Sequence, residues 1–257
     1  MRDYSIITEL PGGRASREQI SRLYHRYRTA ASYAAGKDVL EVGCGAGQGL
    51  GYMAAKARRV VGGDSTESSL RQARQHSNGA TPLVRLDAHR LPFPRASFDL
   101  VILFEAIYYL ASPEAFLAEA RRVLRPAGTL LVSTVNCSWL DFNPSPFSVR
   151  YFAAPDLAAS LRRQGFEVEL FGAYRAAPET VRDKAVSVLK RSAVRLGLMP
   201  RSMKGKELFK RIFFGRLEAL PAEVHDGMAE YLPPEMISAE TPDCGHKILY
   251  AVAQKAG

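Results

Sequence analysis

Several features that would place the chain in a particular class are missing from its 257 residues. No apolar run reaches the roughly 18 residues that a membrane-spanning helix requires. The first residues, MRDYSIITELPGG, lack the hydrophobic segment of a secretory signal. Cys44, Cys137 and Cys244 are the only cysteines, and none forms a CxxC pair. We therefore expect reduced thiols in a cytoplasmic protein, with neither a disulfide framework nor a zinc site.

Repeats, low-complexity tracts and metal-ligand clusters are also missing. Asp141 is not accompanied by further acids at ligand spacing, so we expect no metal site. Hydrophobic residues make up 47% of the chain, which permits a sizeable core. The length suits one large domain, or a domain that carries an insertion.

Strand-like runs alternate with helix-like segments through most of the chain. The runs cover residues 38–43, 58–63, 82–87, 98–104, 129–135 and 166–173. Ser16 and Gln19 have the spacing of a helix capping box, and Ser112 precedes a proline as an N-cap would. This alternation is typical of βαβ units and predicts an α/β doubly wound fold with a mostly parallel sheet.

The alternation stops near Tyr174. Residues 175–245 look helical, whereas 246–255 alternate as one more strand. We expect that strand to complete a seven-stranded sheet, with a helical insertion before it. The predicted division is an N-terminal helical cap (1–36), an α/β core (37–174), a basic helical lid insertion (175–245) and the last strand of the core sheet (246–257).

The turn after the first strand is rich in glycine. Five glycines fall between Gly43 and Gly51, within the run DVLEVGCGAGQGLGYMA. Such a turn between a strand and a helix lets a ligand approach the backbone near the positive end of the helix. The dinucleotide pattern G-x-G-x-x-G/A fails in every register, because its last position falls on Gln48, Leu50 or Tyr52. The turn therefore favours a ligand other than a dinucleotide.

Acidic residues lie at the ends of three successive strand-like runs. Glu41 precedes the glycine turn, Asp64 ends the second run and Asp87 ends the third. The carboxyl ends of parallel strands meet at one edge of a sheet, so these side chains should converge. A carboxylate at Asp64 can accept hydrogen bonds from both hydroxyls of a ribose, and Asp87 can accept one from an adenine amine. The pattern predicts a site for an adenosine without phosphates.

Four motifs, in order, carry a resemblance to a known family: VLEVGCGAGQG, VVGGDSTESSL, LVRLDAHRLPFPRASFDLVILFEAIYYL and EARRVLRPAGTLLV. They resemble those of class I S-adenosylmethionine-dependent methyltransferases, of the small-molecule (type 11) subfamily, over residues 37–135 and more weakly over 151–174. The resemblance implies a Rossmann-like methyltransferase fold, with S-adenosyl-L-methionine as cofactor and S-adenosyl-L-homocysteine as product. It implies these cofactor-binding residues: Glu41, Gly43, Cys44, Gly45, Gly47, Asp64, Ser65, Asp87, Ala88, Phe104, Glu105 and Tyr24.

Within that set, the glycines would lie under the methionine moiety, and Phe104 and Glu105 would line the sulfonium pocket. Cys44 is interpreted as a small packed residue. Tyr24 and Tyr27 lie on the apolar stripe of the first predicted helix. They are explained equally well as core residues or as part of a helix that folds over the cofactor.

The candidate catalytic residues are His246, Tyr109 and Tyr108. Many similar methyltransferases have a histidine where this chain has Tyr109. A tyrosine of ordinary pKa is a poor base near neutrality, so both tyrosines are expected to orient the acceptor. An antiparallel last strand would begin at the cofactor edge, which makes His246 the candidate general base, although a structural role also fits it. His89 is expected to be exposed.

The positive charge of the chain is concentrated in one segment. Twelve Lys/Arg and three acids lie between Arg175 and Arg216, a net +9 that equals the excess of the whole chain. By topology the insertion should cover the cofactor face. A solvated helix surface, a rim for an anionic substrate and a peripheral membrane contact all stay open. Nucleic acid is not favoured, because no RNA-binding module is recognisable.

Residues 143–174 also resemble methyltransferases of saccharide and cell-surface polymer biosynthesis. This similarity favours O-methylation of a small-molecule acceptor that is saccharide- or lipid-linked. An anionic acceptor is the interpretation that the basic segment adds. A secondary-metabolite O- or N-methyltransferase is the near alternative. A protein that binds the cofactor without turnover is the alternative from a different class.

Overall fold

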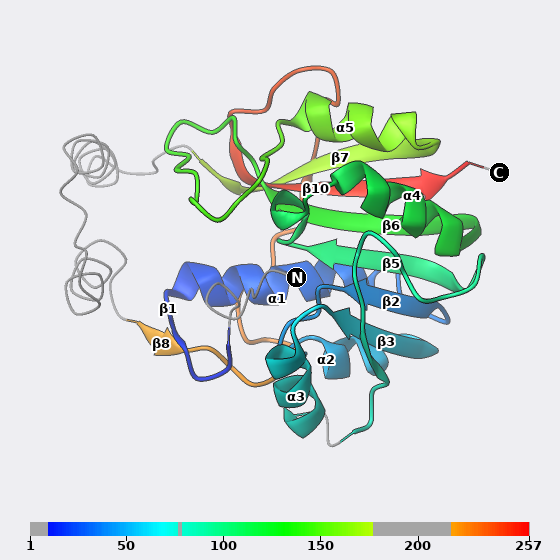
Figure 1. The fold of residues 1–257 in the computed structure, drawn as a ribbon. Coiled ribbons are helices and arrows are strands. Elements are labelled where there is room, and N and C mark those ends of the chain that lie inside the picture. The colour runs from blue at the N-terminus through cyan, green and yellow to red at the C-terminus, as the bar shows by residue number, and fades with distance from the viewer. Residues whose placement is uncertain (1–9, 77–78, 177–216, 257) are drawn as a thin grey trace.

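The computed structural model describes residues 10–76, 79–176 and 217–256. At its centre lies an eight-stranded sheet with the strand order β4-β3-β2-β5-β6-β10-β7-β9 (Figure 1). The strands are β2 (Asp38–Val42), β3 (Arg59–Asp64), β4 (Leu83–Arg85), β5 (Phe98–Phe104), β6 (Leu124–Val135), β7 (Phe166–Arg175), β9 (Glu235–Ile237) and β10 (His246–Lys255). Two further short strands, β1 (Arg14–Ala15) and β8 (Glu218–Ala219), pair antiparallel with each other.

The helices pack on both faces of this sheet. They are α1 (Arg17–Ala31), α2 (Leu50–Ala54), α3 (Glu67–His76), α4 (Pro113–Val123) and α5 (Ala154–Arg163), with a 3₁₀ turn η1 (Ile107–Tyr109). Leu40 of β2 belongs to the buried cluster that includes α4 and α5, whereas its neighbour Val39 belongs to the cluster that includes α1, α2 and α3. Burial on both faces explains why the central strands read as continuous apolar runs.

The strands from β4 to β6 run parallel, and β10 runs antiparallel to both β6 and β7. The fold class predicted from the sequence is therefore confirmed. The helix starts are confirmed too. The Ser16 Oγ accepts a hydrogen bond from the Gln19 amide at 3.2 Å and the Gln19 side chain accepts one from the Ser16 amide at 3.0 Å. At α4 the Ser112 Oγ accepts a hydrogen bond from the Ala115 amide at 3.3 Å, without a reciprocal side-chain bond.

Two expectations about the sheet and the insertion need correction. The sheet has eight strands instead of seven, because the short strand β9 pairs antiparallel with β7. The described part of the predicted helical insertion, residues 217–245, contains β8 and β9 and no helix. Each strand is too short to show a period in the sequence, and β9 follows two prolines. Residues 177–216, which carry most of the basic charge, lie outside the described residues.

Candidate functional site

A cavity of about 830 Å³ opens at the carboxyl ends of β2, β3, β4 and β5. Its walls include twelve of the fifteen predicted site residues: Glu41, Gly43, Cys44, Gly45, Asp64, Ser65, Asp87, Ala88, Phe104, Glu105, Tyr108 and Tyr109. They come from segments that are up to 68 positions apart in the chain and meet only because the strands are parallel. The structure thus brings most of the predicted site together.

The glycine turn is held to the end of β3 by Asp64. One carboxylate oxygen of Asp64 accepts a hydrogen bond from the Gly45 amide at 2.9 Å, and the other accepts one from the Thr66 amide at 2.8 Å. Gly45 has a φ of +55°, a conformation in which a side chain would be strained. A carboxylate offers about four acceptor positions, so Asp64 keeps acceptor capacity toward the cavity beyond these two bonds.

Glu41 lines the cavity and is only 1% exposed. Its Oε1 accepts a hydrogen bond from the Tyr27 hydroxyl at 2.6 Å, while its Oε2 has no hydrogen-bond partner among the described residues. Burial raises the pKa of Glu41 to about 7, although the Tyr27 hydroxyl and the charge of Arg26 oppose that rise. A buried carboxylate oxygen without a partner is costly, so this atom is suited to a cationic or hydrogen-donating ligand.

The tyrosine that reaches the cavity is Tyr27 and not Tyr24. Tyr24 packs edge-on against Tyr52 and Tyr231, and it does not line the cavity, which supports its interpretation as a core residue. A Cβ added at Gly49 would lie 2.0 Å from the Tyr27 ring. Because Gly49 has no Cβ, the Tyr27 ring fits against the glycine turn, and its hydroxyl donates a hydrogen bond to Glu41.

Gly47 also differs from its expected role. It does not line the cavity, and a Cβ added there would lie 2.8 Å from the Cβ of Ala73 on α3. Its function is close packing of the turn against that helix. The sequence showed the glycines but could not tell which of them face a ligand and which face a neighbouring element.

Asp87 and His89 form a fixed pair after β4. The Oδ1 of Asp87 accepts hydrogen bonds from the His89 amide at 2.9 Å and from the His89 Nδ1 at 2.6 Å. The Ser112 amide donates to the His89 Nε2 at 3.2 Å, which places the ring proton on Nδ1. These bonds, the backbone one first, lower the pKa of Asp87. The expectation that His89 is simply exposed was wrong: it lines the cavity and holds Asp87.

Glu105 and Tyr108 lie beside each other after β5. Glu105 has a φ of +49°, which is uncommon for a residue with a side chain. It accepts a hydrogen bond from the Tyr108 hydroxyl at 3.1 Å. Burial, together with the charge of Glu105, holds the pKa of Tyr108 well above its usual value. Tyr108 therefore stays protonated at neutral pH and is a hydrogen-bond donor, which fits an orienting role.

His246 is placed away from the cavity. It begins β10 at the carboxyl edge of the sheet, and its strand is antiparallel, as the sequence indicated. However, β10 is separated from β5 by β6, and the imidazole Nδ1 lies 3.1 Å from the Oδ2 of Asp243. The prediction that His246 opens at the rim of the cavity was wrong because the sequence indicated the direction of the last strand but not its position across the sheet.

Sequence reasoning missed three cavity residues of α1, which are Gln19, Leu23 and Arg26, whereas one interpretation of the sequence already places Tyr27 on a helix over the cofactor. Gln48, also in the cavity wall, donates from its side chain to the Pro221 carbonyl at 2.7 Å, and its own carbonyl accepts from the Val224 amide at 2.8 Å. Part of the predicted insertion thus contacts the glycine turn. The capping box indicated α1, but no sequence signal located residues 221–224.

Some chemistries have no support in the part of the chain that is described. Residues 10–76, 79–176 and 217–256 hold no group of three or more side chains arranged to bind a metal ion. No helix within the same ranges is long and apolar enough to cross a membrane. Burial raises the pKa of the Cys44 thiol well above its ordinary value, so Cys44 is not a reactive thiolate.

The residues that line the cavity fit an adenosine that carries a cationic, phosphate-free tail. Four acids (Glu41, Asp64, Asp87 and Glu105) and the glycine turn line the cavity, and one oxygen of Glu41 has no described partner. Arg26 is the one Lys/Arg among the described lining residues. A site built for a pyrophosphate would instead offer several cations or free amides. These residues therefore suit a ligand with ribose and adenine hydrogen-bond donors and a positively charged end.

Residues 40–132 match a family model described as a methyltransferase domain. Over 152 residues, the chain is 40% identical to a probable S-adenosylmethionine-dependent methyltransferase of Mycolicibacterium smegmatis, covering 56% of this chain and 57% of that protein. A phthiotriol/phenolphthiotriol dimycocerosates methyltransferase of Mycobacterium ulcerans is 37% identical, covering 55% and 50%. A fatty-acid O-methyltransferase of Mycolicibacterium smegmatis is 38% identical, covering 43% and 41%. The chain thus spans about half the length of these curated relatives.

The fold has counterparts among solved structures. A SAM-dependent methyltransferase from Thermotoga maritima superposes with a TM-score of 0.59 over 92% of each chain, at 16% sequence identity. At that identity the likeness shows the fold alone, which is the Rossmann-like arrangement described above.

Proposed function

Since residues 40–132 form a class I S-adenosylmethionine-dependent methyltransferase domain, we propose that the protein transfers a methyl group from S-adenosylmethionine to an oxygen of a small-molecule acceptor. The acceptor we propose is saccharide- or lipid-linked and anionic. Two of the relatives are named for lipid acceptors, which supports the lipid-linked class. The unpartnered Oε2 of Glu41, in a cavity with three further acids, is the observation that carries the cofactor assignment.

The residues that would hold the cofactor follow from their chemistry. Asp64 would accept hydrogen bonds from the ribose hydroxyls, and Asp87 would accept one from the adenine amine. Glu41 would face the ammonium group of the cofactor. Gly43 and Gly45 would let the methionine moiety approach the backbone. When bound, the cofactor supplies a methyl group on a positively charged sulfur, which makes the leaving group a good one.

The described residues would act mainly by positioning and by excluding water. Tyr108 and Tyr109 form an aromatic wall, with ring centroids 4.5 Å apart, and would orient the acceptor by contact with their rings. The Tyr108 hydroxyl keeps its proton and donates it in a hydrogen bond to Glu105. His89 uses both ring nitrogens in the hydrogen bonds that hold Asp87, so it is not poised as a base. An acceptor whose oxygen is already ionised needs no base. This chemistry favours a carboxylate acceptor.

Transfer of a labelled methyl group tests the proposal. The protein is incubated with methyl-tritiated S-adenosylmethionine and, separately, with oleate, a galactolipid or free galactose. We expect S-adenosylhomocysteine to form together with label that extracts into the organic phase, most with oleate. The Asp64→Ala variant serves as the control with weakened cofactor binding. Label on amine acceptors alone would favour the secondary-metabolite alternative. Cofactor binding without S-adenosylhomocysteine formation with any acceptor would favour a binding protein.

A further inference from the structure

Exposed apolar side chains gather in one loop of the molecule. Among the described residues, five large hydrophobic side chains are exposed, and three of them lie between β6 and α5: Leu140 (75%), Phe147 (54%) and Val149 (50%). We call residues 137–151 the rim loop. Single exposed hydrophobic residues are ordinary, but several in one loop indicate an interaction surface.

The rim loop is held in place by hydrogen bonds. Its two ends meet in an isolated bridge between Asn136 and Phe152. The Ser145 amide donates to the Tyr151 hydroxyl at 2.9 Å, and the Val149 amide donates to the Tyr108 carbonyl at 2.8 Å. Because its backbone is anchored at several points, the loop presents its apolar side chains as a formed surface.

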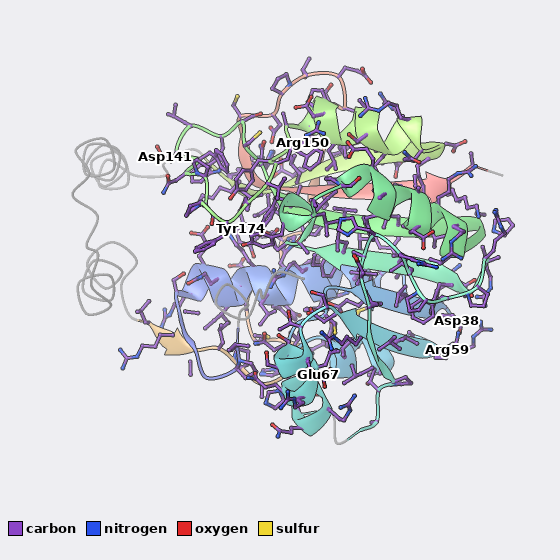
Figure 2. The ribbon with its side chains drawn as sticks, in the orientation of Figure 1. Asp38, Arg59, Glu67, Asp141, Arg150 and Tyr174 are labelled. Atoms are coloured by element: carbon purple, nitrogen blue, oxygen red, sulfur yellow. The ribbon has the colours of Figure 1, made fainter. Side chains whose placement is uncertain are left out.

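The rim loop lies at the same end of the sheet as the cavity. Figure 1 shows it extending beyond the ends of β7 and β10. In Figure 2, Asp141 of this loop lies at the opposite end of the molecule from Asp38 and Arg59, which mark the amino ends of β2 and β3. The loop therefore stands at the carboxyl edge, where the cavity opens.

An apolar path connects the rim loop to the cavity wall. Val149 is both an exposed residue of the loop and a lining residue of the cavity. Behind it, the Tyr151 ring stacks on Tyr108 with centroids 5.3 Å apart, and Phe142 meets Tyr151 edge-on at 4.7 Å. An acyl chain that leaves the cavity past Tyr108 would thus stay on apolar and aromatic surface.

The charge of the rim loop favours a lipid surface over a charged partner. Between residues 137 and 151 the sequence has one acid, Asp141, and one base, Arg150, so the loop has no net charge. Arg150 is paired with Glu114 at 3.1 Å. Apolar tips without net charge suit insertion between the chains of neutral phospholipids.

We propose that the rim loop docks on a neutral phospholipid surface, so that an acyl-chain acceptor passes from that surface into the cavity along Val149. This inference rests on the proposed function, because it assumes a lipid-linked acceptor. It adds the surface from which the acceptor is taken, and it assigns that surface to a loop distinct from the basic segment 175–216.

Vesicle flotation tests the proposal with matched variants. The test variant is Leu140→Ser/Phe147→Ser, and the control is Leu232→Ser/Met236→Ser, which alters the other two exposed hydrophobic residues. None of these four lines the cavity. With phosphatidylcholine vesicles, we expect the wild type and the control to float, and the partition constant of the test variant to fall at least tenfold.

Other outcomes would overturn the docking proposal. Equal flotation of the test variant and the wild type would assign membrane contact to a surface other than the rim loop. Flotation of the wild type only with phosphatidylglycerol vesicles would assign it to charge. A change of the test variant from dimer to monomer in sedimentation without vesicles would assign the loop to a second copy of the chain.

A parallel titration with S-adenosylhomocysteine separates this inference from the proposed function. We expect equal affinity in the wild type and both variants. If they all bind the cofactor product and methylate soluble hexanoate, yet none floats, the docking proposal fails and the proposed function stands. If the wild type does not bind the product, the proposed function fails instead.

Discussion

Glu41 is the next-to-last residue of β2 and lines the cavity, with one carboxylate oxygen bonded to Tyr27 and the other without a described partner. Burial raises its pKa from an ordinary 4.5 to about 7 in the folded protein. Between these two pH values the unfolded chain has lost the proton that the folded protein still holds. The free energy of unfolding therefore falls as pH rises through this window.

Replacement of Glu41 by glutamine should remove this pH dependence. A shift from 4.5 to about 7 corresponds to about 3 kcal/mol of stability that the wild type loses between these pH values. Glu41→Gln keeps an acceptor for Tyr27 and carries no titratable proton. Urea unfolding at about pH 5 and about pH 8 measures the difference. Parallel pH dependences of the two proteins would contradict the environment described for Glu41.

Binding of the cofactor product should release a proton from Glu41. A cationic group beside Glu41 would lower its pKa, so near pH 7 about half a proton per site should be released on binding. Titration calorimetry in phosphate and in Tris buffer measures the release, because the two buffers differ in ionisation enthalpy. Glu41→Gln should show equal enthalpies in both. Proton release that persists in this variant would show that another group titrates.

The convergence of the acids at the strand ends could be predicted from the sequence, because the carboxyl ends of parallel strands lie at one edge of the sheet. The roles of the aromatic residues and glycines could not. Tyr24 and Tyr27 lie on the same apolar stripe, and only the space above Gly49 decides that Tyr27 reaches Glu41. That choice depends on how α1 packs on the turn, which no local pattern encodes.

At the scale of elements, the contact between α1 and the glycine turn determines the shape of the cavity. Gly49→Ala would place a methyl group within the Tyr27 ring, and overpacking of this kind costs about 1–3 kcal/mol of folding free energy. We expect weaker cofactor binding as well, because Tyr27 must leave Glu41. In a Tyr27→Ala background the same change should cost little. Strictly additive losses in a urea double-mutant cycle would contradict this contact.

The order of the strands also changes the expected role of His246. Since β6 separates β10 from β5, His246→Ala should leave the turnover of oleate within about twofold of the wild type. It should instead lower stability by about 1–2 kcal/mol, through loss of its contacts with Asp243 and Gly172. A fall in turnover of about 100-fold with unchanged stability would restore His246 as a base.

All seven predicted strands were recognisable because each is an apolar or alternating run bounded by helix or turn signals. Their order across the sheet was not, because it depends on contacts between distant segments that no local pattern encodes. Strand β9 was missed because three residues show no periodicity. The lid role predicted for 175–245 falls largely on residues 177–216, outside the described residues, and stays a prediction.

At the scale of the whole molecule, the chain is a two-faced sheet whose carboxyl edge carries the cavity and the rim loop. The fold class and the cofactor type were predictable because they depend on periodicity and on motifs that this architecture needs. The acceptor class was not predictable. The walls that would surround the acceptor come from α1, η1 and the rim loop, and the sequence does not place these segments relative to one another.

Calorimetric titration of S-adenosylhomocysteine into the wild type and Asp64→Ala, with NAD as a second ligand, tests the central claim most directly. Hydrogen bonds to a charged partner contribute about 1–3 kcal/mol, so we predict a loss of affinity of about 10- to 100-fold in Asp64→Ala and no binding of NAD by the wild type. Thermal unfolding checks that the variant, which loses the bonds from Gly45 and Thr66, remains folded. Unchanged affinity in a folded Asp64→Ala protein, or binding of NAD, would contradict the assignment of this cavity to S-adenosylmethionine.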